Sequence, residues 1–118
     1  MSAATGVVVA RVAWGVALAT VPDRILGVTQ PKRPGTPVAP RILRVLGVRH
    51  LLQGGVETLA PLPAVHYLGA VADGLHALSG VGLAAVDPRW RRAALIDSAI
   101  AATFGLAAAL TAGTDRGR

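Results

Sequence analysis

Apolar residues dominate four stretches of the chain, each interrupted by only a few polar residues. The four stretches cover residues 6–22, 41–60, 64–86 and 92–112. Proline and charged residues separate them, as in Pro22-Asp23-Arg24 after the first and Asp87-Pro88 before the last. A helix that crosses a bilayer needs about 20 mostly apolar residues. The pattern predicts an all-α fold, an integral membrane four-helix bundle that forms a single domain from all 118 residues.

The first stretch has a second interpretation, as a cleaved secretory signal. Ala17-Leu18-Ala19 resembles a small-residue cleavage site, which would remove residues 1–19. However, no basic residue precedes the apolar run, and Arg11 interrupts it. Both features favour a helix that is retained in the mature protein.

Residues 23–40 form a basic, proline-rich segment. Prolines recur at every third residue of its second half, at Pro31, Pro34, Pro37 and Pro40. Proline interrupts helices and central strands, so we expect this whole segment to be an irregular cytoplasmic loop.

Residues 41–60 are the least hydrophobic of the four stretches. Their polar side chains include Arg44, Arg49, His50, Gln53 and Glu57. One interpretation is an amphipathic helix that lies on the membrane surface. The other is a transmembrane helix whose polar side chains face neighbouring helices.

The net charge of +6 comes from basic residues that lie mainly between the apolar stretches. They are Arg24, Lys32, Arg33, Arg41 and Arg44 in the first basic region, and Arg89, Arg91 and Arg92 in the second. Such loops stay in the cytoplasm, which puts both termini on the extracytoplasmic side of the cell inner membrane. Basic residues beside a bilayer also attract anionic membrane lipids. Only 3% of the residues are aromatic, so no nucleic-acid partner is expected.

Ionisable residues inside the apolar stretches predict a polar core for the bundle. They are Arg11, Arg49, His50, Glu57, Asp73, His76 and Asp97. An isolated charge at the centre of a bilayer costs at least about 2.5 to 3.5 kcal/mol, so these side chains should face one another. We expect the two arginines to pair with Asp73 and Asp97.

Small residues accompany the polar ones at helical spacing. In the third stretch, for example, Gly69, Asp73, His76 and Gly80 recur at i, i+4, i+7 and i+11. The glycines expected to lie at helix contacts are Gly15, Gly47, Gly54, Gly69, Gly80 and Gly105. Small residues at these positions let transmembrane helices approach closely.

Three kinds of chemistry could use such a polar core. His50 and His76 could be axial ligands of a haem, or could bind a divalent metal together with Asp73. Protons could move through Asp73, His76, Glu57 and His50. The pattern favours a simpler role, a hydrogen-bonded network that fixes how the helices pack. The chain has no cysteine and no soluble-enzyme motif, so we expect no catalytic residue, no metal and no cofactor.

Two short runs resemble the small four-span bacterial proteins of the DoxX-like group. They are Arg44-Val-Leu-Gly47-Val-Arg49-His50-Leu-Leu-Gln53-Gly54 and Asp73-Gly-Leu-His76-Ala. The first contains the Gly-x-Arg motif of that group's second helix, and the second contains the aspartate of its third. The resemblance covers residues 41–105, and the composition is similar to that of actinobacterial proteins. Most members of the group have no assigned activity, and some relatives are subunits of membrane oxidoreductases that act on quinones.

These observations predict a small non-catalytic protein of the inner membrane. We expect it to be an accessory or scaffolding subunit of a larger envelope complex, for instance one that transports lipids. Its partners would be membrane lipids and a transmembrane protein or further copies of itself. The alternative is a membrane redox or transport component that binds quinone, haem or protons through the Arg/Asp/His cluster.

Overall fold

The structure is a computed structural model that describes residues 3–32, 35 and 37–116, with side chains as far as residue 112. Arg33, Pro34 and Thr36 of the predicted proline-rich loop lie outside the described residues. Helices joined by short connections account for nearly all of the described chain, and no described residue lies in a strand. The predicted all-α class is confirmed.

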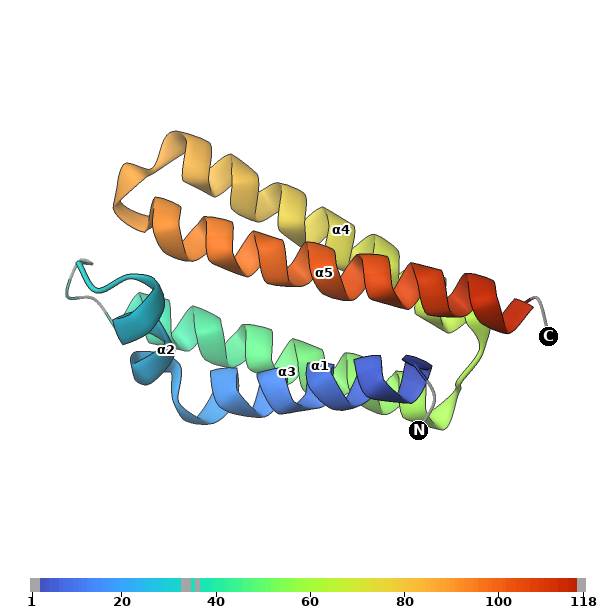
Figure 1. The fold of residues 1–118 in the computed structure, drawn as a ribbon. Coiled ribbons are helices and arrows are strands. Elements are labelled where there is room, and N and C mark those ends of the chain that lie inside the picture. The colour runs from blue at the N-terminus through green and yellow to red at the C-terminus, as the bar shows by residue number, and fades with distance from the viewer. Residues whose placement is uncertain (1–2, 33–34, 36, 117–118) are drawn as a thin grey trace.

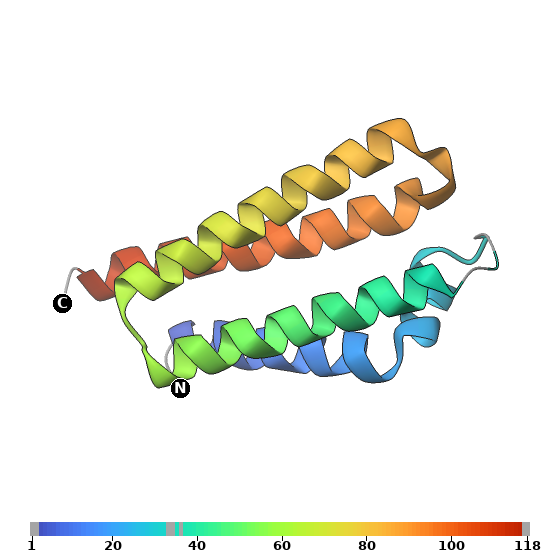
Figure 2. The same ribbon diagram turned by 180° about the vertical axis from the view of Figure 1, so that it is seen from behind.

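Four long helices, one short helix and a single 3-10 turn make up the fold of the described residues (Figure 1). In chain order they are α1 (Ala3–Thr20), α2 (Pro22–Thr29), α3 (Val38–Leu59), α4 (Pro63–Val86), η1 (Pro88–Trp90) and α5 (Arg91–Arg116). Successive long helices run in opposite directions (Figures 1 and 2). As a result α1 begins and α5 ends at one end of the molecule, while α2 and the turn between α4 and α5 lie at the other.

The long helices associate as two antiparallel pairs. Helix α1 packs mainly against α3, and α4 packs mainly against α5, with fewer contacts between the pairs. Figures 1 and 2 show the pairs as two layers along the long axis of a molecule that measures 50 × 27 × 18 Å. The ion pair between α1 and α4 described below lies where the two layers meet.

The predicted packing glycines lie at contacts between helices. A Cβ atom built on any of them would come within 3.1 Å of an atom of another helix; these glycines are Gly15, Gly47, Gly54, Gly69, Gly80 and Gly105. Gly55, Gly74 and Gly82 instead have nothing within 4 Å of the corresponding position. The six contact glycines therefore let the helix backbones approach one another closely.

The expectation that residues 23–40 are irregular throughout is wrong, because Pro22–Thr29 forms helix α2. Pro22 occupies the first turn, where its missing N–H costs no hydrogen bond and its fixed φ suits a helix. Asp23 also lies in the first turn, where its charge complements the helix dipole. The closely spaced prolines begin only at Pro31, after α2 has ended.

The turn between α4 and α5 is organised by Asp87. Its carboxylate accepts a hydrogen bond from the backbone N–H of Arg89 at 3.1 Å and another from Arg89 Nε at 3.0 Å. Pro88 follows in the first turn of η1. The hydrogen bonds from Arg89 lower the pKa of the Asp87 carboxyl below its ordinary value.

Three helical segments are long and apolar enough to cross a membrane, judged by length and composition. They are Ala3–Thr20, Pro63–Val86 and Pro88–Ala112, which contain 18, 24 and 25 residues. At 1.5 Å per residue they measure about 27 to 38 Å, close to the roughly 30 Å of a bilayer's hydrocarbon core. These segments suggest a membrane protein. Helix α3 is of similar length but carries several charges.

Candidate functional site

An ion pair between α1 and α4 forms the centre of the candidate site. Nη1 of Arg11 donates a hydrogen bond to Oδ1 of Asp73 at 2.9 Å, and Nη2 donates to Oδ2 at 2.5 Å. Both side chains are completely buried. Two parallel hydrogen bonds between a guanidinium and a carboxylate also fix the relative orientation of the two groups. This ion pair therefore sets the rotation of α1 relative to α4.

Two further charged residues, both on α3, extend this pair. Nη2 of Arg49 donates to Oδ1 of Asp73 at 3.4 Å, so this carboxylate accepts hydrogen bonds from both arginines. Oε2 of Glu57 lies 3.8 Å from Nε of Arg11, and Gln53 donates to the other Glu57 oxygen at 3.5 Å. Two guanidinium groups thus face two carboxylates, and their formal charges balance. Charge balance reduces the cost of burying such groups.

Aromatic rings lie against the Arg11 guanidinium. Nη1 of Arg11 is 3.3 Å from Nδ1 of His50, and its Cζ atom lies 4.9 Å from the centre of the Phe104 ring. The His50 and Phe104 rings are themselves 5.9 Å apart. A cation above an aromatic face is stabilised by the ring quadrupole. Phe104 is therefore part of the site, although a single phenylalanine in an apolar helix gives no sequence signal of that role.

We call these residues the central cluster. Its members are Arg11, Arg49, His50, Glu57, Asp73 and Phe104. The helical stripes explain how they meet: Gly47, His50, Gly54 and Glu57 are all buried on one face of α3, and Gly69 and Asp73 on one face of α4. The structure thus brings together five of the seven predicted core residues.

The other two predicted core residues form a separate pair between α4 and α5. Nε2 of His76 lies 2.5 Å from Oδ2 of Asp97, and these side chains are 20% and 26% exposed. The expectation that Asp97 pairs with an arginine is wrong. Both arginines lie at Asp73, and His76 lies one turn further along the same face of α4, opposite Asp97.

The central cluster leaves some polar atoms unmatched. Within the part of the chain that the structure describes, three buried atoms of the cluster have no hydrogen-bond partner, namely Arg11 Nε, Arg49 Nη1 and Glu57 Oε2. Arg11 Nε and Glu57 Oε2 attract each other as an ion pair without a hydrogen bond. Buried polar atoms without a hydrogen-bond partner are uncommon in native proteins. These three atoms are therefore the positions of this site that could bind a group that the protein transfers.

The geometry weighs against one of the alternative chemistries, the binding of a divalent metal. Among the described residues, no three His, Asp or Glu side chains gather in a metal-binding arrangement, so His50, His76 and Asp73 do not form a ligand set.

Replacing Arg49 by glutamine should lower the free energy of unfolding by only about 1 kcal/mol. Its side chain is 29% exposed, and its hydrogen bond to Asp73 is long at 3.4 Å. Unfolding of the purified protein by SDS in mixed micelles, followed by circular dichroism, would measure the change. Arg44→Gln is the matched control, because Arg44 is exposed on the same helix. A second variant, Asp73→Asn, removes the carboxylate that both arginines contact. If Arg49→Gln lowers the free energy of unfolding as much as Asp73→Asn does, the secondary role of Arg49 is contradicted.

Comparison with known proteins gives no match: no family model, no curated protein and no solved structure aligns with this chain. The function proposed below therefore rests on the residues and contacts of the chain itself.

Proposed function

We propose that the chain is a non-catalytic protein of the cell inner membrane with four transmembrane helices, α1, α3, α4 and α5. The distribution of polarity carries this proposal. The charged groups of the central cluster are buried where the helices meet, while large apolar side chains are exposed along all four helices. This is the reverse of a water-soluble domain, which avoids large exposed apolar surfaces. Lipid would cover this surface without cost.

Helix α3 supports the fourth span through its exposed face. Its large apolar side chains that are at least half exposed are Val38, Ile42, Val45, Val48, Leu52, Val56 and Leu59. They recur every three or four residues and form one stripe along the helix. The opposite face buries His50 and Glu57 in the protein. A helix lying on the membrane surface would instead expose its polar face to water, so this arrangement favours the spanning interpretation.

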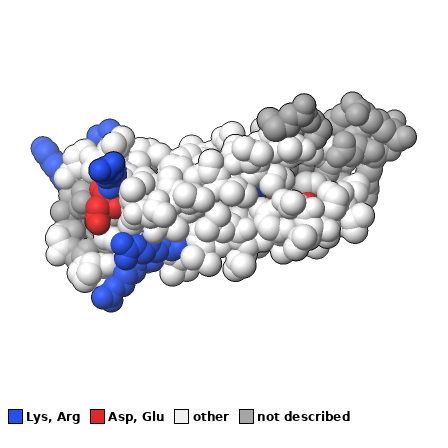
Figure 3. All heavy atoms as spheres, turned by 90° about the horizontal axis from the view of Figure 1, so that it is seen from below, with Lys and Arg blue, Asp and Glu red and all other residues white. Residues whose placement is uncertain are grey.

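The distribution of basic residues supports the orientation. Figure 3 shows lysine and arginine gathered at the end of the molecule that carries α2, while the remaining described residues of the visible face are mainly uncharged. Basic residues at the ends of transmembrane helices remain in the cytoplasm. We therefore assign this end to the cytoplasm and both termini to the outside.

Single-cysteine labelling tests the topology, since the natural chain has no cysteine to interfere. Lys32→Cys and Asp87→Cys should react with a membrane-impermeant maleimide only after the cells are permeabilised. Leu62→Cys, in the connection between α3 and α4, should react in intact spheroplasts. If α3 only lies on the surface, Lys32→Cys and Leu62→Cys will label from the same side, and the four-span proposal fails.

The role that we propose is that of an accessory or scaffolding subunit in a larger envelope complex, with lipid transport as one such setting. The charged groups of the central cluster bind mainly one another, which suits a structural core. The exposed apolar faces can pack against lipids, against another transmembrane protein or against further copies of this chain.

Purification of the tagged protein from its native membrane, at its native expression level and in mild detergent, tests this role. Mass spectrometry should find a larger membrane complex in fixed stoichiometry with this protein. An unrelated tagged four-span protein of similar abundance is the control for detergent carry-over. A protein that purifies alone, without partners or further copies of itself, would contradict the subunit role.

A second candidate function is a membrane transport or redox component that binds protons, quinone or haem through the central cluster. One observation favours it, the buried Glu57 Oε2 that has no hydrogen-bond donor among the described residues. Such a carboxylate within a membrane can take part in proton transfer. Proton flux into liposomes should then occur and should stop in Glu57→Gln, and a Soret band would indicate haem. A colourless protein without proton flux would exclude haem binding and proton transport, but not quinone binding.

A further inference from the structure

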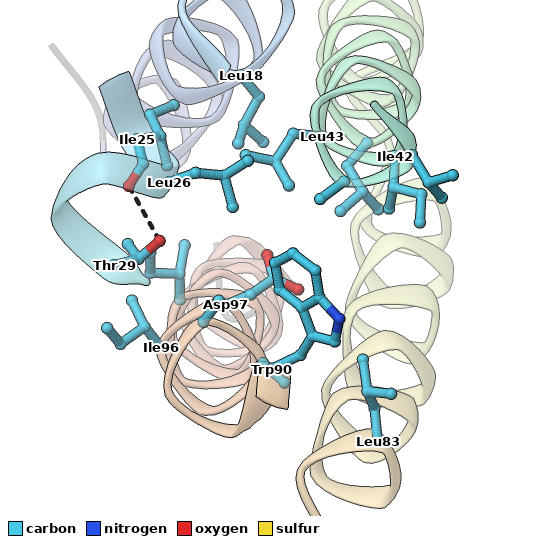
Figure 4. A pocket seen from close by; sticks show the side chains of 16 residues that line it. Leu18, Ile25, Leu26, Thr29, Ile42, Leu43, Leu83, Trp90, Ile96 and Asp97 are labelled. Carbon is cyan, nitrogen blue, oxygen red and sulfur yellow. Dashed lines mark hydrogen bonds between the residues drawn. The ribbon is translucent and has the colours of Figure 1, made fainter. Parts of the chain in front are cut away.

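A cavity of about 290 Å³ lies between the two helix pairs at the basic end of the molecule, away from the central cluster. Its walls come from every helix of the fold and from η1. In Figure 4, Leu26 and Leu43 approach the cavity from one side, and Trp90 and Asp97 from the other. The volume is close to the lower limit, about 300 Å³, of the pockets that hold small molecules.

The lining of the cavity is almost entirely apolar. Leucine, isoleucine, valine and alanine supply most of it, and Trp90 adds an indole ring. Among the described residues that line the cavity, Asp97 is the only charged one, and its carboxylate is already paired with His76. A lining of this kind suits a hydrocarbon group rather than a polar ligand.

Exposed arginines stand next to lining residues in the sequence of three of these helices, α2, α3 and α5. Arg24 precedes Ile25 on α2, Arg41 precedes Ile42 on α3, and Arg92 precedes Ala93 on α5. Arg44, between Leu43 and Leu46, is exposed as well. Of the ion pairs that the described residues form, none includes these arginines. Helix α2 and the first turns of α3 and α5, which carry these arginines, lie at the same end of the molecule as the cavity (Figure 1). We call Arg24, Arg41, Arg44 and Arg92 the arginine rim.

From this geometry we infer that the cavity and the arginine rim form a binding site for one anionic phospholipid of the cytoplasmic leaflet. An acyl chain would enter the apolar cavity, and the phosphate would lie among the guanidinium groups at the rim. The inference rests on the proposed placement in the membrane, in which this end lies at the cytoplasmic surface. It goes beyond general attraction to anionic lipids, because it assigns the acyl chain and the headgroup of the lipid to particular residues.

The charges also fix the orientation of this lipid. Asp97 is the seventh residue of α5 and so lies about 9 Å along the helix from Arg91. Its carboxylate would repel a phosphate that moved into the cavity, whereas the rim attracts it. Trp90, close to the start of α5, is suited to the boundary between headgroups and acyl chains. The headgroup therefore stays outside the cavity, while the acyl chain points toward the middle of the bilayer.

Quenching of Trp90 fluorescence tests the site directly, because Trp90 lines the cavity. In the Trp14→Phe background Trp90 is the only tryptophan. The protein is placed in phosphatidylcholine nanodiscs that contain a small, equal fraction of either brominated phosphatidylglycerol or brominated phosphatidylcholine with the same chains. We expect stronger quenching by the anionic lipid. Equal quenching by the two lipids would overturn the inference.

One set of variants tests binding of the lipid headgroup, and a second set tests binding of the acyl chain. Each of Arg41→Gln and Arg44→Gln should weaken the preference for phosphatidylglycerol about fivefold, the effect expected of one basic residue near an anionic headgroup. Lys32→Gln removes a charge from the same end of the molecule, but outside the arginine rim, and should change the preference for phosphatidylglycerol less. Ala93→Leu fills part of the cavity and should reduce quenching, whereas Ala102→Leu, exposed on α5 outside the cavity lining, should not.

The outcomes distinguish this inference from the proposed function. A protein that enters nanodiscs and labels with the expected topology, but whose quenching ignores the arginine and Ala93 variants, overturns the lipid site alone. A protein that fails the topology test overturns the membrane placement first. The arginine variants are at exposed positions, so they remain informative even if Ala93→Leu does not fold.

Discussion

Replacing Asp73 by asparagine is expected to lower the free energy of unfolding by about 3–5 kcal/mol, the usual cost of removing one partner from a buried ion pair. The asparagine side chain has nearly the same shape as aspartate but carries no charge. Arg11, which is completely buried, would then lose both of its short charge-assisted hydrogen bonds. Arg49 would lose its partner as well. SDS titration of the purified protein, followed by circular dichroism, would measure the loss.

Two further variants show whether this loss comes from the buried charge. Asp87→Asn is the matched control, because Asp87 pairs with Arg89 at an exposed turn where asparagine caps the helix equally well. It should have no measurable effect. The double variant Arg11→Met/Asp73→Leu removes both charges and should be more stable than Asp73→Asn. If Asp73→Asn is as stable as the natural protein, the buried ion pair does not hold the helices together.

The second large effect is expected from Gly47→Ala, which should destabilise the protein by about 1–3 kcal/mol through overpacking. The added Cβ would lie 2.6 Å from the carbonyl oxygen of Gly15 and 2.7 Å from the backbone nitrogen of Ala19. Both obstacles are backbone atoms of α1, so no side chain can rotate away. Helices α1 and α3 would have to move apart, and the distance from α3 to the central cluster would change with them. Thermal unfolding in detergent would show the loss.

Gly55→Ala is the matched control on the same helix, with the opposite expected sign. A Cβ at Gly55 meets nothing within 4 Å. Alanine is a better helix former than glycine by about 0.5–1 kcal/mol, so this variant should be slightly more stable. Equal effects of Gly47→Ala and Gly55→Ala would mean that helix propensity, rather than close approach of the helices, decides the stability.

Sequence periodicity was informative because a helix repeats every 3.6 residues. The spacing of Gly47, His50, Gly54 and Glu57 is enough to put them on one face, and all of them are buried in the structure. The predicted ends of the second and third stretches, at residues 60 and 86, likewise agree with the ends of α3 and α4. The proline content of residues 23–40 was a less reliable guide. Its closely spaced prolines begin at Pro31, and the residues before them form an eight-residue helix.

The amino-acid sequence by itself determined the helical class, the approximate ends of the long helices and the face that each one buries. Only the tertiary structure decided the partners: Asp73 with Arg11 and Arg49, Asp97 with His76, and Phe104 with the Arg11 guanidinium. The reason is physical. Periodicity acts within one helix, whereas a choice between partners depends on the rotation and axial shift of one helix against another, which the packing of all the helices sets together.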